Sequence, residues 1–337
     1  MNGQKVWMVS SLIIIGVFLS SCRDIRTSTK INADGSCQRT VVMEGDSTSS
    51  LNGSYPVPRD SSWTVVYDDK SDPKTYTITK SFPSVKRMNQ EYSQPKPDTL
   101  MQLRLSMRLQ KKFRWFHTVY RYSEIYHTIN PFPEYPVSDY LTQEELQLYY
   151  LDEDTLDLDD KVDNWLTESM LQEFLSSLYA AADSLKETGI TKKMIESRKD
   201  TLIQVLKSNL SDDELPGQIL SIFNSSNNES MKKFITSIIQ KMNRKNEFIF
   251  DLNGNYSNQV IMPGLILDTN AKTLEGNTIT WQFESRHFLF EDYEMWVESR
   301  MVNRWAIILT GVIGILLIAS LVLGSLLSRA KPKTEKA

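Results

Sequence analysis

Six carboxylates crowd the segment from residue 151 to residue 160. Clustered carboxylate oxygens bind hard cations such as Ca²⁺, and paired carboxyl groups can act as general acid and general base. The segment lacks the glycine and the closing glutamate of an EF-hand loop. Acids at a helix start interact favourably with the helix dipole, so a solvated helix start is the simpler interpretation. A carboxylate-based envelope enzyme that uses the acids of 144–160 stays open as an alternative function. The six are Asp152, Glu153, Asp154, Asp157, Asp159 and Asp160.

Histidine and cysteine form no nucleophilic or metal-binding pattern in the sequence. The three histidines are His117, His127 and His287, and none stands at a spacing typical of metal ligands. Of the two cysteines, Cys22 lies in a lipidation motif described next, which leaves Cys37 without an intramolecular disulfide partner. The sequence therefore predicts no catalytic residue, no metal ligand and no cofactor.

A lipidation motif ends at Cys22. Lys5 precedes an apolar stretch, Val6–Phe18, that is too short for the roughly 20 residues needed to span a bilayer. Leu19, two serines and Cys22 follow, a pattern that resembles the bacterial lipobox, in which the cysteine thiol takes a diacylglycerol before cleavage. We predict that residues 1–21 are a lipoprotein signal peptide and that Cys22 is the acylated first residue. An uncleaved anchor is the alternative, and it would give the same topology.

A second membrane attachment is predicted at the other end of the chain. The run from Ala306 to Leu327 is apolar, uncharged and long enough to cross a bilayer. Trp305 stands at its edge, and a basic tail over 329–337 follows, which the positive-inside rule places in the cytoplasm. We expect a transmembrane helix over 304–328 in a bacterial cytoplasmic (inner) membrane. The bulk of the chain then lies outside the cytoplasm.

A basic stripe is expected on one strand. Apolar and polar residues alternate from Leu103 to Leu109, the period of a half-buried strand whose side chains point to alternate faces. The predicted contacts to anionic lipid are Arg104, Arg108, Lys112 and Arg114. An ordinary solvated sheet face is the alternative. The net charge of −4 gives no field that would attract nucleic acid. The expected partners are therefore the membrane, anionic lipid, or a membrane protein to which this chain is an accessory subunit.

The spacing of apolar residues changes along the chain, and this change indicates which segments are strands and which are helices. Strand-type patterns fill 22–139 and 246–303, and helical spacing fills 140–245. This order predicts an α+β fold: an antiparallel sheet built from N- and C-terminal segments, a helical insertion, and one C-terminal transmembrane helix. The expected strands or strand pairs are 26–43 around Ala33-Asp34-Gly35, 63–67, 75–82, 247–250, 260–267 and 278–283, with a hairpin turn at 251–255.

Two segments carry a resemblance to a known family. Ala33-Asp34-Gly35-Ser36 after the lipidated cysteine, and the closing segment over 262–283 with Met262-Pro263-Gly264 and Trp281, are similar to LppM-type bacterial envelope lipoproteins. The resemblance covers about a third of the chain and omits the helical insertion. It implies a non-enzymatic surface lipoprotein, in some members one that binds lipid.

Overall fold

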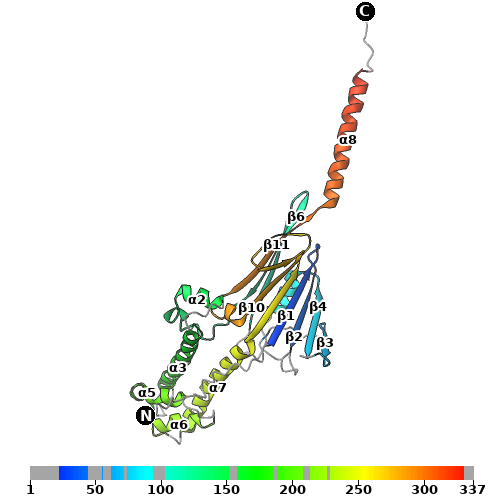
Figure 1. The fold of residues 1–337 in the computed structure, drawn as a ribbon. Helices are drawn as coiled ribbons and strands as arrows, with labels where there is room; N and C mark the ends of the chain where they lie inside the picture. The colour runs from blue at the N-terminus through cyan, green and yellow to red at the C-terminus, as the bar shows by residue number, and fades with distance from the viewer. Residues whose placement is uncertain are drawn as a thin grey trace, which may run out of the picture.

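The computed structural model describes residues 23–44, 55, 62–71, 74–93, 103–151, 158–184, 189–207, 213–225 and 228–329. These residues form two β-sheets, a helical block beyond one end of the sheets, and a single long helix beyond the other end (Figure 1). The predicted α+β class with a C-terminal helix is confirmed. Cys22 and the carboxylates of 152–157 lie outside the described residues.

The first sheet joins the N-terminal strands to strands from the C-terminal half in the order β3-β4-β2-β1-β7-β10-β9. Its strands are β1 (Arg23–Ile31), β2 (Cys37–Glu44), β3 (Thr64–Asp68), β4 (Thr75–Phe82), β7 (Gly254–Ile261), β9 (Thr273–Glu275) and β10 (Thr278–Glu284). β1 and β2 form the expected hairpin, in which Gly35 has a φ of 98°. β1 and β7 pair in parallel, and the other pairs are antiparallel.

The second sheet has four antiparallel strands in the order β5-β6-β11-β8. They are β5 (Leu105–Phe113), β6 (His117–Tyr126), β8 (Leu265–Thr269) and β11 (Tyr293–Val302). The expected single sheet is thus divided in two, because the chain leaves the first sheet after β7 at Pro263-Gly264. Gly264 has a φ of 86°, and a Cβ there would lie 2.4 Å from the Arg300 carbonyl oxygen, so this close crossing requires glycine.

One hydrophobic core fills the space between the two sheets. Side chains that point inward from both sheets, including Val41, Ile78, Tyr122 and Val297, belong to one buried cluster. Helix α1 (Val85–Tyr92) follows β4 and contributes Val85, Met88 and Tyr92 to the same cluster. The two sheets therefore form a sandwich with side chains interdigitated in its interior.

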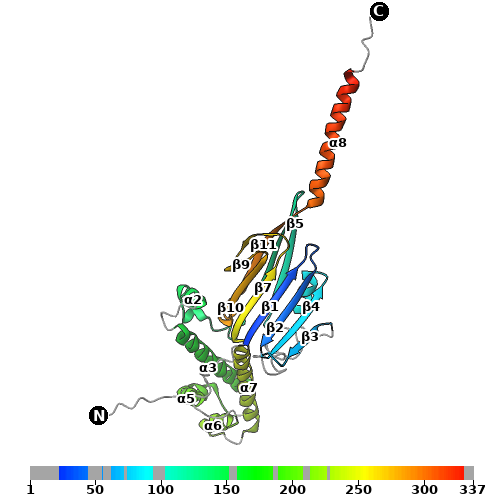
Figure 2. The same ribbon diagram turned by 45° about the vertical axis from the view of Figure 1, so that its right-hand side comes forward.

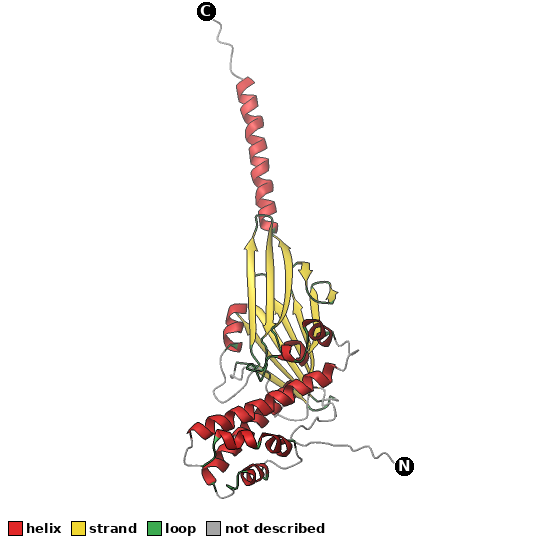
Figure 3. Ribbon diagram, turned by 90° about the vertical axis from the view of Figure 1, so that its left-hand side faces the viewer, coloured by secondary structure: helices red, strands yellow, loops and turns green. Residues whose placement is uncertain are grey.

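The helices of the helical block lie together beyond one end of the strands (Figure 3). Their buried side chains form a second hydrophobic core. The helices of the block are α2 (Gln143–Tyr150), α3 (Leu158–Ser184), α4 (Lys192–Ser197), α5 (Lys199–Leu206), α6 (Leu215–Ile222) and α7 (Glu229–Leu252). Short 3₁₀ turns lie at Val137–Asp139 and Ser285–Phe288. Thr191 caps α4, as expected: its side chain accepts from the Met194 N–H.

Two local expectations about the end of α7 were wrong. Residues 247–250 were expected to form a strand and 251–255 a hairpin turn, but α7 continues to Leu252 and leads almost directly into β7. Phe248 and Leu252, four residues apart, are both buried in the core of the sandwich, so helical packing outweighs the strand propensity of this aromatic run.

The two ends of the sandwich carry different elements (Figure 2). At one end α7 enters β7, and Arg23 pairs with Gly254. At the other end helix α8 (Arg304–Arg329) continues from β11 after Asn303. We call these the helical-block end and the α8 end.

Candidate functional site

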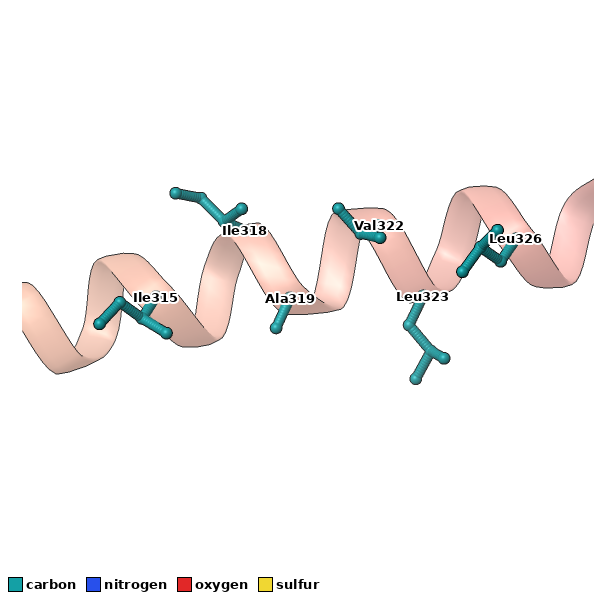
Figure 4. A pocket seen from close by; sticks show the side chains of 6 residues that line it. All are labelled: Ile315, Ile318, Ala319, Val322, Leu323 and Leu326. Atoms are coloured by element: carbon teal, nitrogen blue, oxygen red, sulfur yellow. The ribbon is translucent and has the colours of Figure 1, made fainter.

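Helix α8 has the length and composition of a membrane span over Arg304–Leu326. Its apolar side chains project away from the rest of the chain, and Leu321 is 73 % exposed. Figure 4 shows six of these apolar side chains along α8: Ile315, Ile318, Ala319, Val322, Leu323 and Leu326. A helix of a soluble core would bury such a surface, so this helix requires an apolar environment that the rest of the described chain does not supply.

Asn303 fastens the first turn of α8 to the tip of the β5–β6 hairpin. Its side-chain Nδ2 donates to the carbonyl oxygens of Arg114 (2.8 Å) and Trp115 (3.2 Å), and its backbone N–H donates to Phe116 (2.9 Å). Thr118 Oγ1 in turn donates to Asn303 Oδ1 (3.0 Å). Asn303 is 6 % exposed, and these bonds use both ends of its amide. The helix therefore leaves the sandwich from a fixed joint.

Aromatic side chains surround this joint. Trp115 Nε1 donates to Thr310 Oγ1 (2.8 Å), and the Trp115 and Trp305 rings are 5.6 Å apart at 70°. The Phe113 ring stacks on Trp305 at 6.2 Å. Thr310 lies six residues into α8, about 9 Å along its axis. The hairpin tip thus runs beside the first turns of the apolar helix. We define the hairpin-tip cluster as Phe113, Trp115, Phe116 and Trp305, which are 45–57 % exposed.

The structure spreads the predicted basic stripe along the length of the sandwich. Arg104, Arg108, Lys112 and Arg114 are all exposed, opposite the buried Leu105 and Met107. The strand rises about 3.3 Å per residue, so Arg104 and Lys112 stand roughly 26 Å apart along it. Only Lys112 and Arg114 are close to α8. The sequence predicted Trp305 at the edge of the membrane span, but it did not predict the contacts of Asn303 with the hairpin tip.

The residue after the predicted lipidation site lies far from α8. Arg23 is the first residue of β1, at the helical-block end, whereas Ala33 in the following turn accepts a hydrogen bond from Lys111 near the hairpin tip (3.0 Å). The nine-residue strand between them measures roughly 26 Å. Cys22 is bonded to Arg23, so the two predicted attachments start from opposite ends of the sandwich.

Among the described acids of 144–160, Glu145 has structural partners. Glu145 and Thr142 form the capping box of α2, and Glu145 also pairs with Lys161. Hydrogen bonds from Lys161 and from the Thr142 N–H lower the pKa of Glu145. Within the described residues, no group of three or more His, Cys, Asp or Glu side chains is placed to hold a metal ion.

Comparisons with known proteins give little beyond this geometry. No family model matches the sequence, and no curated protein matches it. Among solved structures, the NMR structure of the folded domain of LppM from Mycobacterium tuberculosis is similar over 84 % of this chain and 91 % of that chain. The sequence identity is 8 % and the TM-score 0.30. This weak likeness involves the family that the two sequence segments resemble, and at this level it carries no inference about binding or activity.

Proposed function

We propose that this chain is a membrane-anchored bacterial lipoprotein whose sandwich and helical block form an interaction or lipid-binding module of the cell envelope. The observation that carries the proposal is the joint at Asn303: an exposed apolar helix leaves the sandwich there beside an exposed aromatic hairpin tip. Tryptophan prefers the headgroup level of a bilayer, so Trp115 and Trp305 suit the interface of the membrane that α8 crosses. The basic tail after α8 favours a cytoplasmic C-terminus.

With its C-terminus in the cytoplasm, α8 is sufficient to hold the chain in the membrane. Insertion of a spanning helix is effectively irreversible, whereas a single acyl chain binds a membrane only marginally. An acyl group on Cys22 reaches the same bilayer only when the long axis of the sandwich lies along the membrane. With α8 and the sandwich collinear, as in Figures 1 and 2, the helical block and Arg23 point away from it.

Carbonate extraction tests the anchor. Full-length protein should stay in the membrane fraction after an alkaline carbonate wash, and so should the Cys22→Ala variant, which should lose incorporation of a fatty-acid analogue. A reporter active only outside the cytoplasm should be silent after Ala337 and active in the 46–60 segment. Release of the full chain by carbonate would overturn the anchor, and an active C-terminal fusion would overturn the orientation.

Depth-dependent quenching tests the interfacial position of the hairpin tip. A fluorophore on Phe116→Cys, in protein reconstituted with brominated lipids, should be quenched. The matched control is Val66→Cys on β3, because Val66 is similarly exposed (56 % against 50 %) but lies on the opposite sheet. Equal quenching at both positions, or none at Phe116→Cys, would contradict the proposal.

Charge reversal tests anionic-lipid binding by the stripe. Each basic residue near an anionic surface contributes about 1 kcal/mol, so Lys112→Glu with Arg114→Glu should weaken binding of the 23–303 fragment to anionic vesicles by roughly 30-fold. The control pair, Arg104→Glu with Arg108→Glu, makes the same charge change far from α8 and should weaken binding less. Equal effects would mean that the sandwich lies flat on the membrane.

A further inference from the structure

Three polar side chains form a hydrogen-bonded chain on the outer face of the four-stranded sheet. Ser106 Oγ lies 2.6 Å from His127 Nε2, and His127 Nδ1 lies 2.9 Å from Asp292 Oδ2. The sequence separations of 21 and 165 residues hide this arrangement from any local motif. Serine hydrolases use the same order of groups: a hydroxyl on Nε2 of an imidazole and a carboxylate on its Nδ1.

The sheet register explains why these three residues meet. Tyr126 at the end of β6 pairs with Tyr293 at the start of β11, so His127 and Asp292 face each other just beyond these strand ends. Ser106 pairs with Ile125, two residues before His127, which makes Ser106 and His127 diagonal neighbours on the same face. Their sequence neighbours Leu105 and Tyr126 are buried, so the three side chains point outward.

Asp292 is held so that it orients the imidazole. Its Oδ1 accepts from the Thr128 backbone N–H (2.9 Å), while Oδ2 faces His127. Partial burial acts to raise the pKa of Asp292, but the Thr128 N–H, His127 and Arg104 outweigh it and the pKa is lowered. An ionised carboxylate can only accept hydrogen bonds, so Asp292 Oδ2 requires the proton of His127 to be on Nδ1. This tautomer leaves the Nε2 lone pair free to accept the Ser106 hydroxyl proton.

We propose that Ser106 is a catalytic nucleophile that cleaves acyl esters, with His127 as general base and Asp292 as the residue that orients it. Ser106 Oγ attacks the ester carbonyl carbon while its proton passes to His127 Nε2. The carbon–oxygen bond to the alcohol then breaks, and the alcohol leaves with that proton. Water attacks the resulting acyl-serine, gives a proton to His127, and releases the acid while that proton returns to Ser106. The sum is ester plus water to acid plus alcohol.

The surroundings of Ser106 indicate the class of ester. Arg104, just before β5, and Arg108 on β5 stand two residues before and after Ser106, and both are exposed. Their positive charge favours an ester with an anionic group. Ser106 is seven residues from Phe113, roughly 23 Å along the strand. With α8 in the membrane and the sandwich collinear with it, as in Figures 1 and 2, this distance keeps Ser106 away from the bilayer. The substrate in this arrangement is a water-soluble ester rather than a lipid of that bilayer.

An active-site probe tests the proposal on the full chain in detergent. A fluorophosphonate should label the wild-type protein on Ser106, as mapped by mass spectrometry. Ser123 is the matched control, because it lies on the same face of β6 and should stay unlabelled. The mapping needs no variant to fold. Absence of label on Ser106 would show that the three residues serve only to link β5, β6 and β11.

Kinetics with a defined pair of esters tests the mechanism. The chain should hydrolyse anionic 4-acetoxybenzoate faster than its neutral methyl ester. Ser106→Ala and His127→Gln should each lower this rate by 100-fold or more, Asp292→Asn should lower it by at least 10-fold, and Ser123→Ala should not change it. A rate that Ser106→Ala leaves intact would overturn the assignment. Equal rates for the two esters would overturn the role of the arginines alone.

Discussion

Strand β6 separates two polar clusters that use similar groups in opposite surroundings. Inside the sandwich, Glu124 accepts two hydrogen bonds from Arg39 (2.6 and 2.8 Å), and both side chains are fully buried. At the end of the same strand, His127 joins Ser106 to Asp292, where the side chains of His127 and Asp292 are 27 % and 49 % exposed. Glu124 and His127 are three residues apart, an odd separation that places them on opposite faces. Burial, more than residue type, separates a structural cluster from one that a substrate can reach.

The Arg39–Glu124 cluster takes hydrogen bonds from both sheets, although the buried Arg39 Nε has no hydrogen-bond partner among the described residues. Arg39 on β2 also donates to Thr29 Oγ1 on β1 (2.6 Å), and the Tyr122 hydroxyl donates to Glu124 Oε2 on β6 (2.9 Å). A buried ion pair offsets its desolvation only with good geometry and additional hydrogen bonds. Because Arg39 and Glu124 belong to different sheets, this pair fixes how the two sheets align across the core.

The largest expected effect comes from breaking the inner pair. Glu124→Gln leaves the Arg39 charge buried without its counter-ion, so it should lower the free energy of unfolding by about 3–5 kcal/mol, measured by urea denaturation in detergent. The control replaces both partners, Arg39→Met with Glu124→Leu, and should recover at least half of the loss because no charge is left in the core. A single variant within 1 kcal/mol of the wild type would refute the structural role.

The pH dependence of stability should reveal the same pair. Burial acts to raise the pKa of Glu124, but the charge and hydrogen bonds of Arg39 outweigh it and the pKa is lowered from its ordinary 4.5. A lowered carboxyl pKa means that the stabilisation is present above the unfolded-state pKa and is lost as the pH falls through the folded-state value. The stability difference between wild type and Glu124→Gln should therefore be largest at neutral pH and shrink below about pH 4. A difference that stays constant down to pH 2 would argue against an ionised Glu124.

The buried thiol of Cys37, unlike the partly exposed hydroxyl of Ser106, should react slowly in the folded chain. Cys37 points into the core beside Arg39, and burial raises the pKa of its thiol from 9.0 to about 11, partly opposed by the Arg39 charge. This shift of about 2 lowers the thiolate fraction at pH 8 roughly 100-fold. Iodoacetamide should thus modify Cys37 at least 100-fold more slowly in the folded chain than in urea, as followed by mass spectrometry. Similar rates in both states would place Cys37 in contact with solvent.

The parts of this fold that local chemistry controls could be predicted from the sequence. The turn at Ala33-Asp34-Gly35, the alternation on β5 and the apolar length of α8 each depend on neighbouring residues. The strand β11 was not expected, although Met295 and Val297 alternate inward along it. Residues 247–250 were assigned to a strand because their aromatic composition favours one, and the packing of α7 reversed that preference.

The outer cluster could not be predicted without the sheet register. Ser106 and His127 meet only because β5 pairs with β6, and Asp292 joins them only because β11 pairs with β6 across 165 residues. Taken one at a time, Ser106, His127 and Asp292 are polar residues of a kind common on protein surfaces. The same holds for Asn303, whose four bonds to the hairpin tip connect segments that are far apart in the chain.

The smallest expected effect on stability comes from the outer cluster, which sharpens the contrast with Glu124. Asp292→Asn removes the charge that faces His127, but water reaches both side chains, and exposed pairs contribute only about 0.2–1 kcal/mol. The free energy of unfolding at pH 7 should therefore fall by less than about 1 kcal/mol, in the same urea assay that reports the loss for Glu124→Gln. His127→Gln should behave similarly, since the Thr128 N–H still holds Asp292 in place. A loss of 3 kcal/mol or more in either variant would show that the outer chain stabilises the sheet as the inner pair does, and the two clusters would then share one structural role.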